Sequence, residues 1–97
     1  MSDQELRLIQ ILVEHGTGWT YGYDLSRASG LKSGTLYPML IRFAERGWLD
    51  HEWRHEEGEK PRHMYRLTSL GRRAAKLALE QANARRAVQT RKLAFNR

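Results

Sequence analysis

The chain begins with apolar residues at the three- and four-residue spacing of one helix face. They are Leu6, Ile9, Leu12 and Val13. Residues at this spacing lie on the same side of a helix, so the pattern predicts a helix from Ser2 to His15. Ser2 or Asp3 can cap its start, and Gly16 is expected to end it.

A second, shorter helix is expected over residues 21–29. Thr20 can cap this helix, and Gly30 follows its last turn, where glycine commonly ends a helix. We expect the helix to bury Leu25 and Ala28. The four residues before it predict a connection or a very short strand.

A third helix is expected from about Ser33 to Arg46, and Gly47 closes it. Its apolar residues fall at positions i, i+4, i+7 and i+8 on one face. They are Leu36, Leu40, Phe43 and Ala44. Pro38 lacks a backbone N–H and crowds the preceding turn, so it indicates an irregular or kinked start of this helix.

Beyond Gly47 the pattern changes to an alternation, as in a strand. Over residues 48–56, a leucine and two residues with ring side chains alternate with three charged residues. The first set is Leu49, His51 and Trp53, and the second is Asp50, Glu52 and Arg54. A charged turn at 57–61 contains glycine and proline, and residues 63–67 predict a returning strand that carries Tyr65 and Leu67 inward. The two strands are expected to form a hairpin.

The last predicted element is a long helix that starts at Thr68 or Ser69 and extends to about Leu93. Apolar and small residues recur along it at alternating intervals of four and three. They are Leu70, Ala74, Leu77, Gln81, Ala84 and Val88. This face either folds back on its own domain or packs against a partner chain and the partner's first helix. We favour a homodimer, because a helix of about 25 residues is too long for one small domain to cover.

The 97-residue chain has the size of a single domain, with a modest core. It contains no cysteine, which excludes disulfides, thiolate zinc clusters and thiol nucleophiles. Its start does not resemble a secretory signal, and no stretch approaches the roughly 20 apolar residues of a membrane span. We therefore expect a cytoplasmic protein with no membrane partner.

The net charge of +6 is unevenly distributed along the chain. Residues 1–59 contain six basic and ten acidic side chains, whereas residues 60–97 contain eleven basic side chains and one acidic one. A basic half favours nucleic acid as a partner, since lysine and arginine that neutralise phosphates release condensed counterions. Ribosomal and nucleoid proteins share this property, so charge alone does not identify the function.

Three helices followed by a hairpin are typical of a winged helix, a mainly α (α+β) fold. A short turn with a glycine, residues 28–33, joins the second and third helices, as in a DNA-reading helix-turn-helix. Five side chains of the third helix and its approach are not needed for the core. They are Lys32, Ser33, Thr35, Tyr37 and Arg42. They form either a solvated helix face or a DNA-contacting surface.

Several segments together identify a family. They are Tyr21-Gly22-Tyr23-Asp24-Leu25, Gly34-Thr35-Leu36-Tyr37-Pro38-Met39-Leu40, Phe43-Ala44-Glu45-Arg46-Gly47-Trp48-Leu49, Pro61-Arg62-His63-Met64-Tyr65-Arg66-Leu67-Thr68 and Gly71-Arg72. Over residues 6–75 the chain resembles the PadR family of bacterial transcription regulators. The resemblance implies a winged helix-turn-helix in residues 1–68 and a C-terminal dimerisation helix with a basic tail in residues 69–97. It also implies a homodimer that binds an operator in double-stranded DNA, usually as a repressor.

The resemblance further implies which residues face DNA. On the third helix these are Lys32, Ser33, Thr35, Tyr37 and Pro38. Lys60 and Arg62 match the family's basic wing. The chain departs from the family pattern at Phe43, at Trp48 and in an acidic wing tip that contains Glu56, Glu57 and Glu59. Because carboxylates near phosphates repel, we expect only Lys60 and Arg62 to contact the DNA backbone from the wing.

The family often senses a small-molecule effector between the first and last helices, but this sequence identifies none. Some relatives stack aromatic compounds on a tryptophan of the last helix, which this chain lacks. We therefore expect Trp48 to pack in the core and Trp53 to be more exposed. Trp19 either lines a pocket or covers the core.

The sequence contains no pattern typical of a metal or catalytic site. His51, His55 and His63 fit no zinc spacing and are expected to be surface residues. No nucleophile with a base, phosphate loop or carboxylate pair is recognisable, so we expect neither an enzyme nor a cofactor. Two other classes stay open: a protein-interaction module, and an architectural protein that binds DNA without sequence preference.

Overall fold

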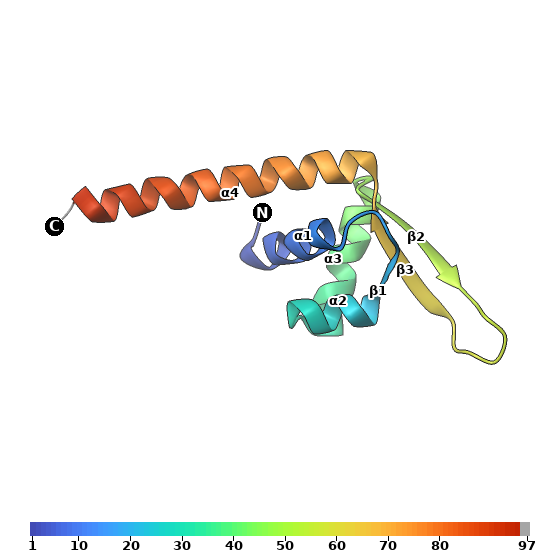
Figure 1. Ribbon diagram of the computed structural model, residues 1–97. Coiled ribbons are helices and arrows are strands. Elements are labelled where there is room, and N and C mark those ends of the chain that lie inside the picture. Colours follow the sequence, from blue (N-terminus) through green and yellow to red (C-terminus); the bar gives the residue numbers. More distant parts are fainter. Residues whose placement is uncertain (96–97) are drawn as a thin grey trace.

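The computed structural model describes residues 1–95, with side chains described as far as Arg91. Those residues form four helices and three strands (Figure 1). In chain order they are α1 (Asp3–His15), β1 (Thr20–Tyr21), α2 (Gly22–Ser29), α3 (Ser33–Glu45), β2 (Leu49–Arg54), β3 (Arg62–Leu67) and α4 (Ser69–Phe95). This order confirms the predicted winged helix. No helix of the described part is long and apolar enough to cross a membrane. Arg97, at the end of the predicted basic tail, lies outside the described residues.

β1 joins the hairpin as a third strand. The strands are antiparallel in the order β1-β3-β2, with Thr20 opposite Tyr65. The prediction that Thr20 caps α2 is therefore wrong: this segment pairs with β3, and the Thr20 side chain is only 4% exposed. The residue that precedes α2 is Tyr21, whose side chain makes no capping hydrogen bond. Below, the wing means β2, β3 and the loop 55–61 between them.

One core lies between the helices and the inner ends of the two wing strands. Its most deeply buried large side chains are Phe43, Leu8, Ile9, Leu25, Leu36, Leu40 and Met64. Two predicted core positions are wrong, because Val13 is 37% exposed and Ala28 is exposed. α1 contacts both α2 and α4, and this arrangement buries Leu8 as well as the predicted Leu6, Ile9 and Leu12. Leu31, in the turn between α2 and α3, is buried where Ala28 is not.

Local hydrogen bonds explain where α1 begins. Ser2 Oγ accepts a hydrogen bond from the Glu5 N–H at 3.1 Å, and Glu5 Oε1 accepts one from the Ser2 N–H at 3.2 Å. This capping box satisfies two backbone donors that the first turn of a helix leaves free. Of the two predicted caps, Ser2 is confirmed. In α3, the helix continues through Pro38 from Ser33 to Glu45.

α4 packs on its own domain with one face and leaves a second face uncovered. The packed face contains Gly71, Ala75 and Ala82, and α4 contacts α1 through it. The predicted dimer residues lie on the uncovered face: Leu70 is 48%, Leu77 56% and Val88 50% exposed, Gln81 and Ala84 are exposed, and Ala74 is half-buried. Figure 1 shows the second half of α4 extending beyond the rest of the molecule. α4 therefore packs on its own domain through residues other than those predicted for the dimer.

Candidate nucleic-acid interface

Side-chain and backbone hydrogen bonds hold the turn between α2 and α3. Gly30 has φ of 72°, a left-handed conformation that favours glycine, and its N–H donates to the Ser26 carbonyl at 2.9 Å. The Ser26 hydroxyl donates to the Leu31 carbonyl at 2.7 Å, and the Leu31 N–H donates to Ser29 Oγ at 3.1 Å. These contacts, with the buried Leu31 side chain, fix the point at which α3 begins.

The predicted DNA-facing residues at the start of α3 are mostly exposed. Lys32, Ser33 and Pro38 are exposed, Tyr37 is 39% exposed, and Thr35 is half-buried. Lys32 directly precedes the helix as its N-cap residue, and its side chain is exposed. A surface with one cation and several hydroxyls suits contacts with phosphates and base edges. These DNA contacts stay predictions.

Arg42 is exposed on α3, and its charge acts on Glu5 of α1. Burial acts to raise the pKa of Glu5, but hydrogen bonds from Ser2 and the charges of Arg42 and Arg46 outweigh it, so the pKa of Glu5 lies below its ordinary value. The positive charge of Arg42 therefore favours the ionised form of a carboxylate in its own chain. The contact of Arg42 with DNA also stays a prediction.

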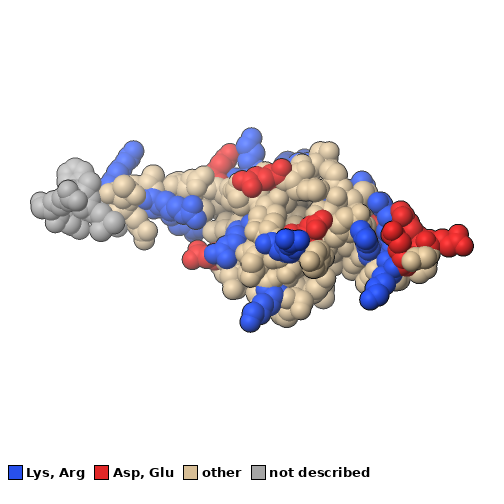
Figure 2. Space-filling model, turned by 60° about the horizontal axis from the view of Figure 1, so that its bottom comes forward, with Lys and Arg blue, Asp and Glu red and all other residues tan. Residues whose placement is uncertain are grey.

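The two predicted wing cations, Lys60 and Arg62, are both exposed. The Arg62 guanidinium lies over the Tyr21 ring, 5.0 Å from its centroid, and this cation–π contact holds it near the start of α2. Figure 2 shows acidic side chains gathered at one end of the molecule with basic ones directly beside them. The acidic residues of the wing tip are Glu56, Glu57 and Glu59. The expectation that this negatively charged tip does not enter DNA deeply stays a prediction.

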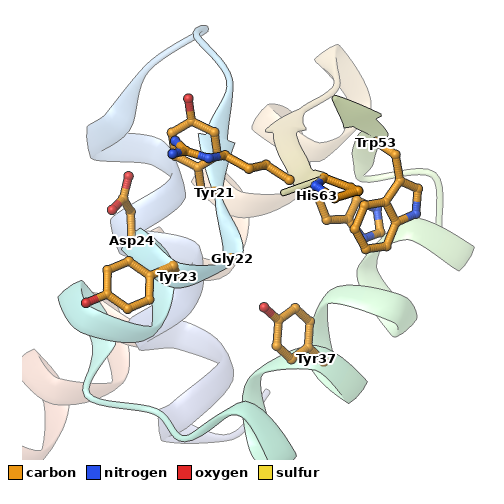
Figure 3. Close-up of a pocket in the computed structure, with 9 residues that line it drawn as sticks. Tyr21, Gly22, Tyr23, Asp24, Tyr37, Trp53 and His63 are labelled. Atoms are coloured by element: carbon orange, nitrogen blue, oxygen red, sulfur yellow. The ribbon is translucent and has the colours of Figure 1, made fainter. Parts of the chain in front are cut away.

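A cleft of about 770 Å³ separates the wing from α2 and α3. It is lined mainly by aromatic residues, with one arginine and one aspartate. They are Tyr21, Gly22, Tyr23, Asp24, Tyr37, Trp53, Pro61, Arg62 and His63. Figure 3 shows Tyr37 on one side of the open space and Trp53 with His63 on the other. The sequence identified Tyr37 and Arg62 as candidates but missed Tyr21 and Tyr23, although both stand in one of the family segments. Trp53 is exposed, as expected, but it was not among the predicted DNA contacts.

Gly22 allows Tyr37 to lie close to α2. A Cβ atom at Gly22 would come within 2.6 Å of Tyr37 Oη. A larger residue at position 22 would therefore push the Tyr37 ring away from α2, which the missing side chain of glycine avoids. Gly22 thus helps to shape the cleft wall that Tyr37 forms.

One face of the wing carries a row of stacked rings, which we call the aromatic strip: Trp53, His63, His51 and Tyr65. Trp53 and His63 stack with ring centroids 4.4 Å apart, and His63 and Tyr65 stack at the same distance. His51 Nδ1 and His63 Nε2 share a hydrogen bond of 3.0 Å, and Tyr65 Oη and His63 Nδ1 share one of 2.9 Å. Both ring nitrogens of His63 are therefore engaged. The alternation along the first wing strand placed His51 and Trp53 on one face, but it did not predict the stacking.

The environment of the strip shifts two pKa values. Burial and the neighbouring His51 lower the pKa of His63, while burial and Tyr37 raise the pKa of Tyr65 to about 12. Both shifts favour the uncharged ring. Among the described residues, no cluster of three or more His, Cys, Asp or Glu side chains could hold a metal ion.

The two remaining tryptophans have structural roles. Trp48 is half-buried and packs against Phe43, with ring centroids 5.4 Å apart, as expected for a core residue. Trp19 is half-buried under Arg66, whose guanidinium lies 4.2 Å from the ring centroid. Of the two alternatives for Trp19, this geometry favours covering the domain over lining the cleft.

Comparison with known proteins agrees with the fold and with the sequence segments. The family model described as "Transcriptional regulator PadR-like family" matches residues 8–77. A PadR family transcriptional regulator from Eggerthella lenta is 30% identical, with a TM-score of 0.77 over 92% of this chain and 86% of that one. A PadR family transcription regulator from Clostridium difficile is 20% identical, with a TM-score of 0.80 over 95% and 99%.

A third solved structure is Bacillus subtilis PadR in complex with operator DNA. It is 20% identical and has a TM-score of 0.68, over 81% of this chain and 48% of that chain. No curated protein sequence is significantly similar to this chain. The family model covers most of the winged helix and the start of α4. The chain therefore belongs to the PadR-like family of transcriptional regulators.

Proposed function

We propose that this chain is a homodimeric, sequence-specific regulator that represses transcription by binding a palindromic operator. The observation that carries the proposal is that Tyr37 of α3 and Arg62 of the wing line one cleft beside the exposed start of α3. Family membership and the operator complex of Bacillus subtilis PadR support the same function. In this proposal the protein acts by binding and not by catalysis.

The exposed start of α3 would enter the major groove. Lys32, Ser33 and Thr35 would contact base edges, and lysine can donate to the O6 and N7 atoms of guanine. Tyr37, Lys60 and Arg62 would hold phosphates on either side of the cleft. The charge of Arg42 also acts on Glu5 of its own chain, which makes Arg42 the weakest member of the predicted set.

Residues 1–68 would bind DNA and residues 69–97 would form the dimer. The uncovered face of α4 supports this division, because about half of the surface of Leu70, Leu77 and Val88 is exposed in the single chain. Burying such side chains against a second copy is favourable by roughly 25 cal/mol per Å². A twofold pair would set two α3 helices about 34 Å apart, one turn of DNA.

A binding titration tests the phosphate contacts. The probe is the duplex immediately upstream of the gene that encodes the chain, titrated between about 50 and 200 mM salt. Lys60→Ala and Arg62→Ala should each weaken binding and flatten the salt slope by about 0.9. Lys76→Ala, which removes an exposed cation from α4, is the matched control and should leave the slope unchanged. Unchanged slopes in both wing variants would contradict the phosphate assignment.

The same titration separates two other functions. Equal affinity for the upstream duplex and for random DNA would indicate an architectural protein. No salt-dependent binding to any duplex would indicate a protein-interaction module. A small-molecule effector and a cytoplasmic location also stay predictions.

A further inference from the structure

Trp53 is the most exposed tryptophan of the chain and has no role in the core. It is 66% exposed on β2, whereas Trp19 and Trp48 are half-buried. The sequence pattern placed Trp53 in register with Leu49, which is 5% exposed, but the wing extends beyond the core at that point. An exposed indole offers a large apolar surface that folding does not use.

The aromatic strip keeps this exposed ring in one place. Trp53 stacks on His63 at an interplanar angle of 26°, and His63 is hydrogen-bonded to His51 and to the buried Tyr65. Tyr65 is only 4% exposed and belongs to the hydrophobic core. Contacts therefore run continuously from the core to Trp53. A ring that is already ordered loses little conformational entropy when it binds a partner.

The position of Trp53 indicates which partner it meets. Trp53, Tyr37 and Arg62 line the same cleft, with Tyr37 on the opposite side from Trp53 (Figure 3). If a DNA strand contacts both Tyr37 and Arg62, the part of the strand between these contacts would lie over this cleft, which Trp53 also lines. Its deoxyribose rings present apolar C–H groups between the phosphates, which complements an indole beside a guanidinium. Asp24 is the one carboxylate among the residues that line the cleft.

We propose that Trp53 packs against the sugar-phosphate backbone of operator DNA in the cleft between the wing and α3, and that His63 positions its ring. This inference rests on the proposed DNA-binding function and adds an uncharged contact that the wing cations do not supply. Trp53 would set how far the DNA strand enters the cleft. The acidic wing tip would then stay outside the groove.

The decisive measurement uses the full chain and the duplex upstream of its gene. Trp53→Ala should weaken binding roughly tenfold, as expected for the loss of one aromatic contact with a nucleotide. The salt slope should not change, because indole releases no counterion; this result distinguishes Trp53 from Lys60 and Arg62. Protection of tryptophan fluorescence from acrylamide on DNA binding should be present in the wild type and in Trp19→Phe. It should be absent in Trp53→Phe.

A double-mutant cycle tests the role of His63. His63→Ala should weaken binding in the protein that contains Trp53 and have no effect in the Trp53→Ala background, because its contribution acts through the Trp53 ring. Equal effects of His63→Ala in both backgrounds would overturn the positioning role. Thermal unfolding of each variant provides the control for folding.

The outcomes separate this inference from the proposed function. If the wild type binds with a steep salt dependence while Trp53→Ala binds equally well, Trp53 makes no DNA contact and the regulator function stands. If Trp53→Ala also flattens the slope, Trp53 acts by placing the cations, which overturns the direct contact. If the wild type binds no duplex, both proposals are wrong.

Discussion

Gly71→Ala is expected to be among the most destabilising small substitutions in this chain, because α4 meets the protein backbone there. A Cβ atom at Gly71 would lie 2.8 Å from the carbonyl carbon of Trp48, 2.9 Å from its Cα, and closer still to its carbonyl oxygen. Ordinary carbon–carbon contacts are about 3.5–4.0 Å, so α4 would have to move by roughly 1 Å. The neighbour is backbone, which cannot rotate away as a side chain can.

The expected loss of stability follows from the contacts that a displaced α4 would weaken. Its first turn is tied to Trp48 and Gly47 through Thr68, whose N–H donates to the Trp48 carbonyl at 2.9 Å and whose hydroxyl donates to the Gly47 carbonyl at 2.7 Å. Overpacking costs about 1–3 kcal/mol and each weakened hydrogen bond about 1 kcal/mol. The higher helix propensity of alanine, compared with glycine, offsets about 1 kcal/mol of this loss. A net loss of about 3 kcal/mol remains, which lowers the melting temperature by roughly 15 °C.

Thermal unfolding followed by circular dichroism at one fixed protein concentration measures this effect. Gly34→Ala is the matched control, because a Cβ atom at Gly34 meets nothing within 4 Å inside a helix. That variant should gain up to about 1 kcal/mol. If Gly71→Ala melted at or above the wild-type temperature, the close approach between α4 and the Trp48 backbone would be wrong.

Three further predictions concern the capping of α1, the dimer and pH. Ser2→Ala should cost about 1 kcal/mol in urea unfolding, because it removes the capping bond to the Glu5 N–H, and an unchanged midpoint would contradict that role. Leu77→Asp and Val88→Asp should each yield folded monomers in sedimentation, because both side chains are half-exposed in the single chain; a dimer that persists in both variants would place the interface elsewhere. The pKa of His63 is lowered in the folded protein, so its contribution to stability is present above the ordinary histidine pKa of about 6.5 and is lost as the pH falls below it. Between pH 7.5 and 5.5, the free energy of unfolding measured in urea should therefore decrease less in His63→Gln than in the wild type. An equal decrease in both proteins would refute the contribution of His63.

Most of the secondary structure could be predicted from the sequence because its causes are local. Helix periodicity, the Ser2 cap and the glycine after α2 all act between residues a few positions apart. The exposed start of α3 follows from these signals, since residues that do not belong to an apolar face remain at the surface. The cations Lys60 and Arg62 could also be identified from the sequence, by their residue type and by the family resemblance.

The tertiary structure alone decided which distant residues meet. Thr20 reads locally as a helix cap, but pairing with Tyr65 of β3 satisfies its backbone and makes it a strand residue. α4 has two faces that small and apolar residues could bury, and the packed structure selects the one with Gly71, Ala75 and Ala82, where Gly71 lets the helix approach the Trp48 backbone. The stacking of Trp53 on His63 depends on the register of the hairpin, in which a shift of one residue would reverse every side chain. Local patterns define the elements, whereas the cleft and its aromatic wall exist only after those elements have packed.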